Sequence, residues 1–248
     1  MKNIPEFTET IEEWTHFFIP LSDGIKLAAR AWLPINAIEQ PVPAILEYIP
    51  YRKRDGTAIR DEQMHPYWAA FGYACVRVDI RGSGESDGLL HDEYLQQELD
   101  DAVEVINWLE HQDWCSGKVG MMGKSWGGFN CLQVAALRPS ALKAIITVCS
   151  TDDRYADDVH YRGGAVLIEN FSWASTISGF MAKPPDPLLL PETWRENWLE
   201  RLQNMPFFAK NWLEHTYKDA YWKHGSINED YSAIEAAVYC VGGWGDAY

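Results

Sequence analysis

Long apolar runs are missing from this 248-residue sequence, and so is any excess of basic charge. No segment approaches the ~20 apolar residues that span a bilayer, and the acidic start MKNIPEFTETIEEW lacks the apolar core of a secretory signal. The sequence has 21 Lys and Arg against 36 Asp and Glu, which gives a formal net charge of −15. Nucleic acids and anionic membranes attract basic surfaces. Neither is therefore expected as a partner, whereas small neutral or cationic ligands stay open.

Cysteine is also sparse, with five scattered residues and no CxxC pair. This usage predicts reduced, buried thiols in a cytoplasmic protein. No HExxH or comparable ligand spacing is present, so we expect neither a metal nor another cofactor. Glycine and proline are too few for a disordered chain, and 47% of the residues are hydrophobic. A folded protein with one large core is predicted.

Strand and helix patterns alternate through residues 1–150, the predicted first part of the core. Two strand-like segments flank Asp23-Gly24, a hairpin turn signal. Apolar strand patterns then alternate with helical spacing, clearest between Leu95 and Leu109. Another helix is expected over 61–71, with Pro66 at or near its start. The alternation predicts an α/β fold: a mostly parallel sheet with antiparallel N-terminal strands.

Composition changes at residues 151–235, which we call the insertion. This segment carries five of the tryptophans among helical patterns and is broken by KPPDPLLLPE. It predicts either a helical cap over a site or extra helices that pack a large core, and composition does not separate the two. Residues 236–248 return to a strand pattern, AAVYCVGGW, which leads to Asp246.

The strongest chemical motif is GKSWG, residues 123–127, between a strand pattern and a helix pattern. This context is that of a nucleophile elbow, which predicts Ser125 as a nucleophile next to a helix N-terminus that can stabilise an oxyanion. A second GxSxG match, GESDG at 84–88, is not followed by such a helix. We interpret it as a loop at the edge of the sheet.

A serine nucleophile needs a base and an acid that orients the base. Asp246 fits the acid, because it follows a strand after the insertion, where the order Ser, Asp, His expects it. No histidine follows Asp246. The seven histidines are His16, His65, His91, His111, His160, His215 and His224. None fits the order of a base, and for His160 we predict a place in the substrate wall.

Three stretches together point to a known family. They are DIRGSGESDG, WLEHQDWCSGKVGMMGKSWGGF and LKAIITVCSTDDRYADDVHYRGG. They resemble the CocE/NonD hydrolases of the X-Pro dipeptidyl-peptidase (S15) superfamily, which includes cocaine esterase and α-amino acid ester hydrolases. The resemblance runs from about Trp14 to Tyr248. It implies an α/β-hydrolase fold with an inserted helical cap and a C-terminal jelly roll.

The resemblance also implies roles for single residues. Ser125 matches the nucleophile and Asp246 the triad acid. Tyr51, in IPYRK, matches a tyrosine whose hydroxyl forms the oxyanion hole with the backbone N–H of Trp126. Asp157 and Asp158 fall near a carboxylate with which α-amino acid ester hydrolases hold a substrate ammonium, one residue out of step.

Additional substrate-binding residues are expected nearby, namely His160, Tyr161 and Trp244. The family histidine, the last sheet strand and the jelly roll are not in these 248 residues, which predicts a truncation after Asp246 and an inactive chain. The expected function is a serine hydrolase that cleaves small esters or amides through an acyl-enzyme. The alternatives are an X-Pro dipeptidyl aminopeptidase and a non-catalytic binding protein. A homo-oligomer stays open. The acids Asp152, Asp153, Asp157 and Asp158 favour substrates that carry an amine.

Overall fold

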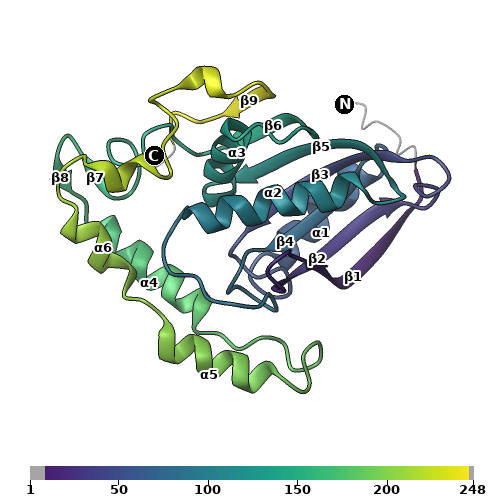
Figure 1. The fold of residues 1–248 in the computed structure, drawn as a ribbon, viewed down its shortest axis with the longest axis horizontal. Helices are drawn as coiled ribbons and strands as arrows, with labels where there is room; N and C mark the ends of the chain where they lie inside the picture. Colours follow the sequence, from purple (N-terminus) through teal and green to yellow (C-terminus); the bar gives the residue numbers. More distant parts are fainter. Residues whose placement is uncertain (1–8, 246–248) are drawn as a thin grey trace.

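The computed structural model describes residues 9–245, and a seven-stranded sheet is its central element (Figure 1). Across the sheet the strands run in the order β1-β2-β4-β3-β5-β6-β9. Their bounds are Ile11–Pro20 for β1, Lys26–Pro34 for β2, Val42–Ile49 for β3, Ala74–Asp79 for β4, Cys115–Lys124 for β5, Leu142–Val148 for β6 and Ala237–Val241 for β9.

The first strands are antiparallel and the rest are parallel. β1 pairs with β2, and β2 with β4, in antiparallel register, and Gly24 takes a φ of 90° in the β1–β2 turn. The pairs β4–β3, β3–β5, β5–β6 and β6–β9 are all parallel. The predicted sheet is confirmed. Because parallel strands finish at one edge, the loops after β3, β5, β6 and β9 lie along the same side of the molecule.

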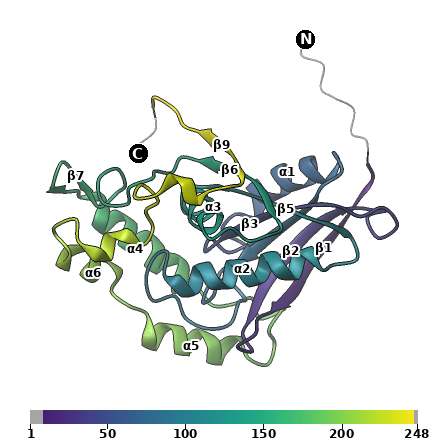
Figure 2. The same cartoon turned by 45° about the horizontal axis from the view of Figure 1, so that its top comes forward.

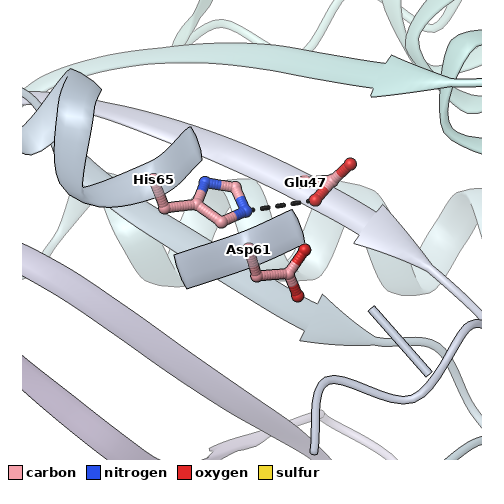
Figure 3. Close-up of side chains that lie close together, drawn as sticks. All are labelled: Glu47, Asp61 and His65. Carbon is pink, nitrogen blue, oxygen red and sulfur yellow. Dashed lines mark hydrogen bonds and ion pairs between the residues drawn. The ribbon is translucent and has the colours of Figure 1, made fainter. Parts of the chain in front are cut away.

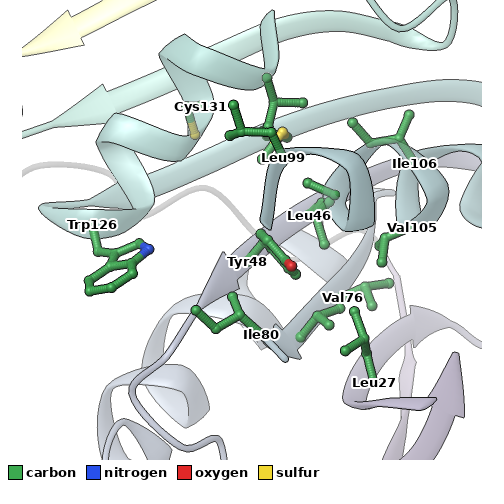
Figure 4. Packing of buried hydrophobic residues seen from close by; sticks show 14 of the residues in the cluster. Leu27, Leu46, Tyr48, Val76, Ile80, Leu99, Val105, Ile106, Trp126 and Cys131 are labelled. Carbon is green, nitrogen blue, oxygen red and sulfur yellow. The ribbon is translucent and has the colours of Figure 1, made fainter. Parts of the chain in front are cut away.

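Helices cover both faces of the sheet. Their bounds are Ala58–Ala69 for α1, Gln96–Glu110 for α2 and Trp126–Ala136 for α3. Neighbouring residues of a buried strand point to opposite faces. Leu46 and Val76 accordingly belong to the main core with α2 and α3 (Figure 4). Ile45 and Cys75 point to the other face and pack with α1. Strands that bury both faces read as near-continuous apolar runs, and in β3 and β4 only the buried charged residues Glu47, Arg77 and Asp79 interrupt the run.

Helix α1 differs from the expected helix in the position of Pro66. The helix begins at Ala58, three residues before the expected start, so Pro66 lies inside it. Proline lacks the N–H that would bond to the carbonyl four residues earlier. The missing hydrogen bond does not end the helix: α1 continues for three residues after Pro66, and the N–H of Ala70 donates to the carbonyl of Pro66.

The insertion contains a small hairpin as well as helices (Figures 1 and 2). Its elements are β7 Tyr161–Arg162, β8 Ala165–Val166, α4 Glu169–Met181, α5 Trp194–Asn204, α6 Phe208–Glu214, and the short 3₁₀ helices η1 Ala220–Lys223 and η2 Tyr231–Ala233. Figures 1 and 2 show α4 and α6 beyond the end of the sheet at which β5 and β6 finish. The boundaries of the insertion stay a prediction. Among residues 9–245, no helix is both long and apolar enough to cross a membrane.

Candidate active site

Ser125 forms the turn between β5 and α3. Its φ of 56° and ψ of −121° lie outside the regions that a side chain favours. The backbone N–H of Ser125 donates to the carbonyl of Val148 (2.9 Å), and its carbonyl accepts from the N–H groups of Gly128 (2.7 Å) and Phe129 (3.0 Å). These bonds hold a strained turn at the carboxyl edge of the sheet, as a nucleophile elbow requires.

The flanking glycines have no room for side chains. A Cβ on Gly123 would lie 2.4 Å from the backbone carbon of Gly127. One on Gly127 would lie 2.8 Å from Cγ2 of Ile49, which ends β3. The glycines of GKSWG therefore allow α3 to begin directly against β5 and β3.

The second GxSxG match, GESDG, does not form such a turn. Its Ser86 is buried in a loop, and the Ser86 hydroxyl donates to the carbonyl of Asp79 (2.7 Å).

Tyr51 follows β3, the parallel neighbour of β5, so it starts from the same edge as Ser125. A Cβ on Gly56 would lie 1.9 Å from the carbonyl oxygen of Tyr51, so a tight turn folds back onto Tyr51. The ring of Tyr51 contacts Phe180 of α4, with centroids 5.4 Å apart. The insertion thus packs directly on the residue expected in the oxyanion hole.

The three basic residues after Tyr51 all form ion pairs, and the first two are buried. Arg52, with a φ of 59°, donates to the carboxylate of Asp55 (2.8 Å) and to the carbonyl of Pro184 (2.7 Å) in the insertion. Lys53 is fully buried, and its Nζ lies 2.7 Å from the carboxylate of Glu85. Arg54 pairs with Asp186 at 3.0 Å. This segment, residues 52–54, joins the core to the insertion.

Trp173 of α4 connects the two expected oxyanion-hole residues. Its ring centroid lies 6.4 Å from that of Tyr51 and 6.1 Å from that of Trp126. Its indole N–H donates to the buried carboxylate of Glu93. Tyr51, Trp126 and Trp173 are therefore brought together, although sequence reasoning assigned Trp173 no place at the site.

Asp246 lies outside the described residues. The strand before it, β9, pairs in parallel with β6, with Val241 opposite Val148. The N–H of Cys149 also donates to the carbonyl of Val241 (3.0 Å). β9 consequently finishes at the same edge as β5, which is where a triad acid is expected. The ring of Trp244 is fully exposed.

The acids of the insertion separate into different environments. Asp153 bonds to Lys218 (2.5 Å) and Asn228 (2.8 Å), and Asp152 accepts from Tyr231, so both hold the insertion together. Asp157 is exposed, whereas Asp158 is buried. Burial first, and then the charge of Glu93, raises the pKa of Asp158 to about 6.

Glu93 is the centre of a buried charged network between core and insertion. It accepts from Arg154 (2.7 Å) and lies 3.0 Å from Nε2 of His160. Burial opposes its ionisation, but the charges of His160 and Arg154 and the hydrogen bonds of His160 and Trp173 lower the pKa of Glu93 to about 2. Arg154 also contacts Nε2 of His224 (2.7 Å). Burial and then this guanidinium lower the pKa of His224 to about 4.

His160 and Tyr161, both expected to line the substrate, are buried within the insertion. Nδ1 of His160 lies 2.8 Å from the amide oxygen of Asn170, so both ring nitrogens have partners. The hydroxyl of Tyr161 donates to the carbonyl of Trp212 (2.9 Å). These contacts support the shape of the insertion, and a substrate-wall role for either residue stays a prediction.

Glu47, Asp61 and His65 form a buried group whose ligand atoms lie within 4.8 Å of one another (Figure 3). His65 Nε2 lies 3.1 Å from Glu47. Arg60 also bonds to Glu47 (2.6 Å) and Asp61 (2.8 Å), and Nε of Arg77 lies 3.4 Å from Asp61. Two guanidinium groups therefore balance the two carboxylates, and we assign no metal to this group.

The sheet order and the strained serine turn between β5 and α3 are those of the α/β-hydrolase fold. Residues 23–248 match the model of the X-Pro dipeptidyl-peptidase (S15) family, and the chain belongs to that family. Cocaine esterase of Rhodococcus sp. (strain MB1 Bresler) is 27% identical over 260 residues, which cover 94% of this chain and 44% of the esterase.

Solved structures share the fold. A CocE/NonD family hydrolase from Staphylococcus aureus matches with a TM-score of 0.69 and 23% identity, over 90% of this chain and 39% of that one. An α-amino acid ester hydrolase also gives a TM-score of 0.69, with 20% identity over 99% of this chain and 46% of that one. The chain thus spans less than half the length of these relatives.

Proposed function

We propose that this chain carries the nucleophile, the oxyanion hole and the triad acid of a serine hydrolase for small esters or amides. The observation that carries the proposal is Ser125, held at a φ of 56° between β5 and α3. A side chain at such a φ costs about 1–3 kcal/mol, and such strain is commonest at active sites.

In the proposed reaction, a base removes the proton of the Ser125 hydroxyl while Oγ attacks the carbonyl carbon of the substrate. The carbonyl oxygen becomes an oxyanion, which accepts hydrogen bonds from the Tyr51 hydroxyl and the backbone N–H of Trp126. The first N–H groups of a helix have no acceptor within the helix, and α3 begins at Trp126. The alcohol or amine then leaves with the proton, and water releases the acid from the acyl-enzyme.

The base is proposed to come from a histidine beyond Tyr248. His160 has partners at both ring nitrogens, and His224 is held by Arg154, so neither is available without breaking a buried contact. Asp246 would orient the missing imidazole. Because triad residues act as a unit, residues 1–248 alone are expected to show only background hydrolysis.

The test compares the product of the complete reading frame with residues 1–248, using p-nitrophenyl esters. Ser125→Ala should lower kcat by at least roughly 10³-fold in the longer protein. Ser86→Ala is the matched control, because it removes a hydroxyl from the other GxSxG match and should leave kcat nearly unchanged. Full activity of Ser125→Ala would refute the proposed nucleophile. A stop codon directly after Tyr248 would instead favour the non-catalytic binding protein.

A preference for substrates with an amine is supported by one observation, the buried carboxylate of Asp158 beside the network of Glu93. Such substrates include α-amino esters and the N-terminus of an X-Pro peptide. Asp158→Asn should lower kcat/KM for an α-amino ester but not for its deaminated analogue. Asp157→Asn, at the exposed neighbour, is the control. Equal wild-type rates on both esters would remove this preference.

A further inference from the structure

Glu98 is a buried carboxylate in the first turn of α2, and three N–H donors surround it. The indole Nε1 of Trp126 donates to it at 2.5 Å, the side-chain amide of Asn130 at 2.8 Å and the backbone N–H of Tyr94 at 3.0 Å. The first two bonds share one oxygen, Oε1, and the third goes to Oε2. Glu98 is 5% exposed.

These bonds fasten the beginning of α3 to two other elements. Trp126 is the first residue of α3 and Asn130 lies one turn further on. The amide of Asn130 also donates to the carbonyl of Tyr48 on β3 (3.1 Å). Glu98 and Asn130 thus tie α2, α3 and β3 together directly behind the serine turn.

The orientation of Trp126 is closely defined as a result. Its indole is fully buried, and its ring centroid lies 5.0 Å from that of Tyr94 and 6.1 Å from that of Trp173. The backbone N–H of Trp126 is the proposed oxyanion donor. A donor that shifts by about 1 Å loses much of its effect on the transition state. The side-chain bond to Glu98 therefore bears on the alignment of that N–H.

Packing alone gives no reason for a carboxylate here. Burying a charge costs several kcal/mol, and an apolar residue would join α2 to α3 at lower cost. A carboxylate adds direction, because each oxygen accepts from a defined donor. Burial raises the pKa of Glu98 to about 7, despite the three hydrogen bonds, and the charge of Glu93 adds to this rise. The other ionisable residues that line the same cavity as Glu98 are Tyr48, Arg81, His91, Asp92 and Asp101, and Arg81 pairs with Asp101.

We propose that Glu98 is a positioning residue for the hydrolase reaction, which holds the first turn of α3 so that the Trp126 N–H faces the oxyanion. The inference rests on the proposed function for its catalytic consequence. The contact itself can be tested in residues 1–248 without any activity.

The first experiment follows the indole N–H signals of residues 1–248 by ¹H–¹⁵N NMR between pH 5 and 9. Trp126→Phe identifies the Trp126 signal by its loss. That signal should move with a midpoint near the pKa of Glu98, about 7. Glu98→Gln should abolish the movement, whereas Asp101→Asn, on the same helix, should retain it. A signal that does not titrate, or that titrates equally in Glu98→Gln, would overturn the proposal.

The second experiment measures kinetics on the product of the complete reading frame. Glu98→Leu removes both anchors of α3 and should lower kcat by about 10- to 100-fold while KM changes by less than about 3-fold. Glu98→Gln keeps an oxygen for Trp126 and Asn130, so it should restore most of kcat. Asp101→Leu deletes a comparably buried carboxylate, paired with Arg81, and should cost stability but not kcat.

The outcomes separate the two proposals. An equal fall of kcat in Glu98→Leu and Asp101→Leu, or no fall in Glu98→Leu, refutes a positioning role. If the wild type cleaves no ester but the Trp126 signal titrates as expected, the proposed function fails and the Glu98–Trp126 anchor stands. If Glu98→Leu does not fold, the titration of Glu98→Gln still decides the contact.

Discussion

Replacing Ser125 by glycine should leave the protein more stable than replacing it by alanine. The serine has a φ of 56° and a ψ of −121°, a conformation that glycine adopts without the steric cost of a Cβ. Ser125→Ala keeps the Cβ and removes the hydroxyl. Comparing glycine with alanine therefore isolates the backbone strain from every contact that the hydroxyl makes.

The expected difference follows from two opposing terms. Relief of the strain is worth about 1–3 kcal/mol. Glycine loses about 0.5–1 kcal/mol more backbone entropy on folding than alanine. The net gain of Ser125→Gly over Ser125→Ala is therefore about 0–2.5 kcal/mol. For a protein of this size, such a gain raises Tm by up to about 10 °C.

Urea unfolding of residues 1–248, followed by far-UV circular dichroism, measures the gain. The two variants should share one m-value and differ in midpoint. Gly117→Ala is a calibration in the opposite direction, since Gly117 has a φ of 76° and open space around the position of a Cβ. It should lower stability by about 1 kcal/mol through strain alone. If Ser125→Gly is less stable than Ser125→Ala, the strain is smaller than the entropy cost of glycine and the reasoning fails.

Three other substitutions test separate parts of the structure. Gly56→Ala, whose Cβ would lie 1.9 Å from the Tyr51 carbonyl, should cost more than about 2 kcal/mol in urea unfolding and lower kcat; a neutral result would contradict the tight turn. Glu93→Ala removes the nearest carboxylate from the buried Arg154, leaving Asp92 at 3.9 Å, and should cost about 3–5 kcal/mol by thermal unfolding, so a loss below about 1 kcal/mol would argue against a buried pair. His224 stays neutral when folded, with its pKa near 4 against 6.5 unfolded, so stability should fall as the pH drops from 6.5 toward 4. His224→Gln should reduce that fall between pH 7 and pH 5, and an unchanged pH dependence would exclude His224 as a source.

Local patterns in the sequence predict the sheet and the serine turn. β3 and β4 are mostly apolar because both of their faces are buried. GKSWG identifies the turn because tight contact with neighbouring backbone demands glycines at fixed spacing. These features depend on residues close in sequence, so a single chain is enough to find them.

The buried polar contacts could not be found in this way. Glu93 accepts a hydrogen bond from Trp173, which lies 80 residues further along the chain. In the sequence, Glu93 belongs to HDEYL, residues 91–95, which has the composition of an ordinary polar loop. Glu98, in contrast, can be recognised from the helical pattern of the sequence. It lies four residues before Ala102, which is on the apolar face of α2, so a charged residue falls within the buried stripe. Periodicity can therefore locate such an acid, but only the packed structure gives its donors.

Residues 52–54 also have a consequence for proteolysis. Trypsin cleaves after arginine and lysine, and the sequence RKR offers three such sites in a row. Arg52 and Lys53 are buried, and Arg52 donates to carbonyl groups of Lys183 and Pro184 in the insertion. A protease must bind an extended, accessible segment, so cleavage after Arg52 and Lys53 requires this segment to leave its packed position. Arg54 is exposed, so cleavage after the two buried residues is the part that reports this opening, and for Arg52 the opening breaks its contacts with the insertion.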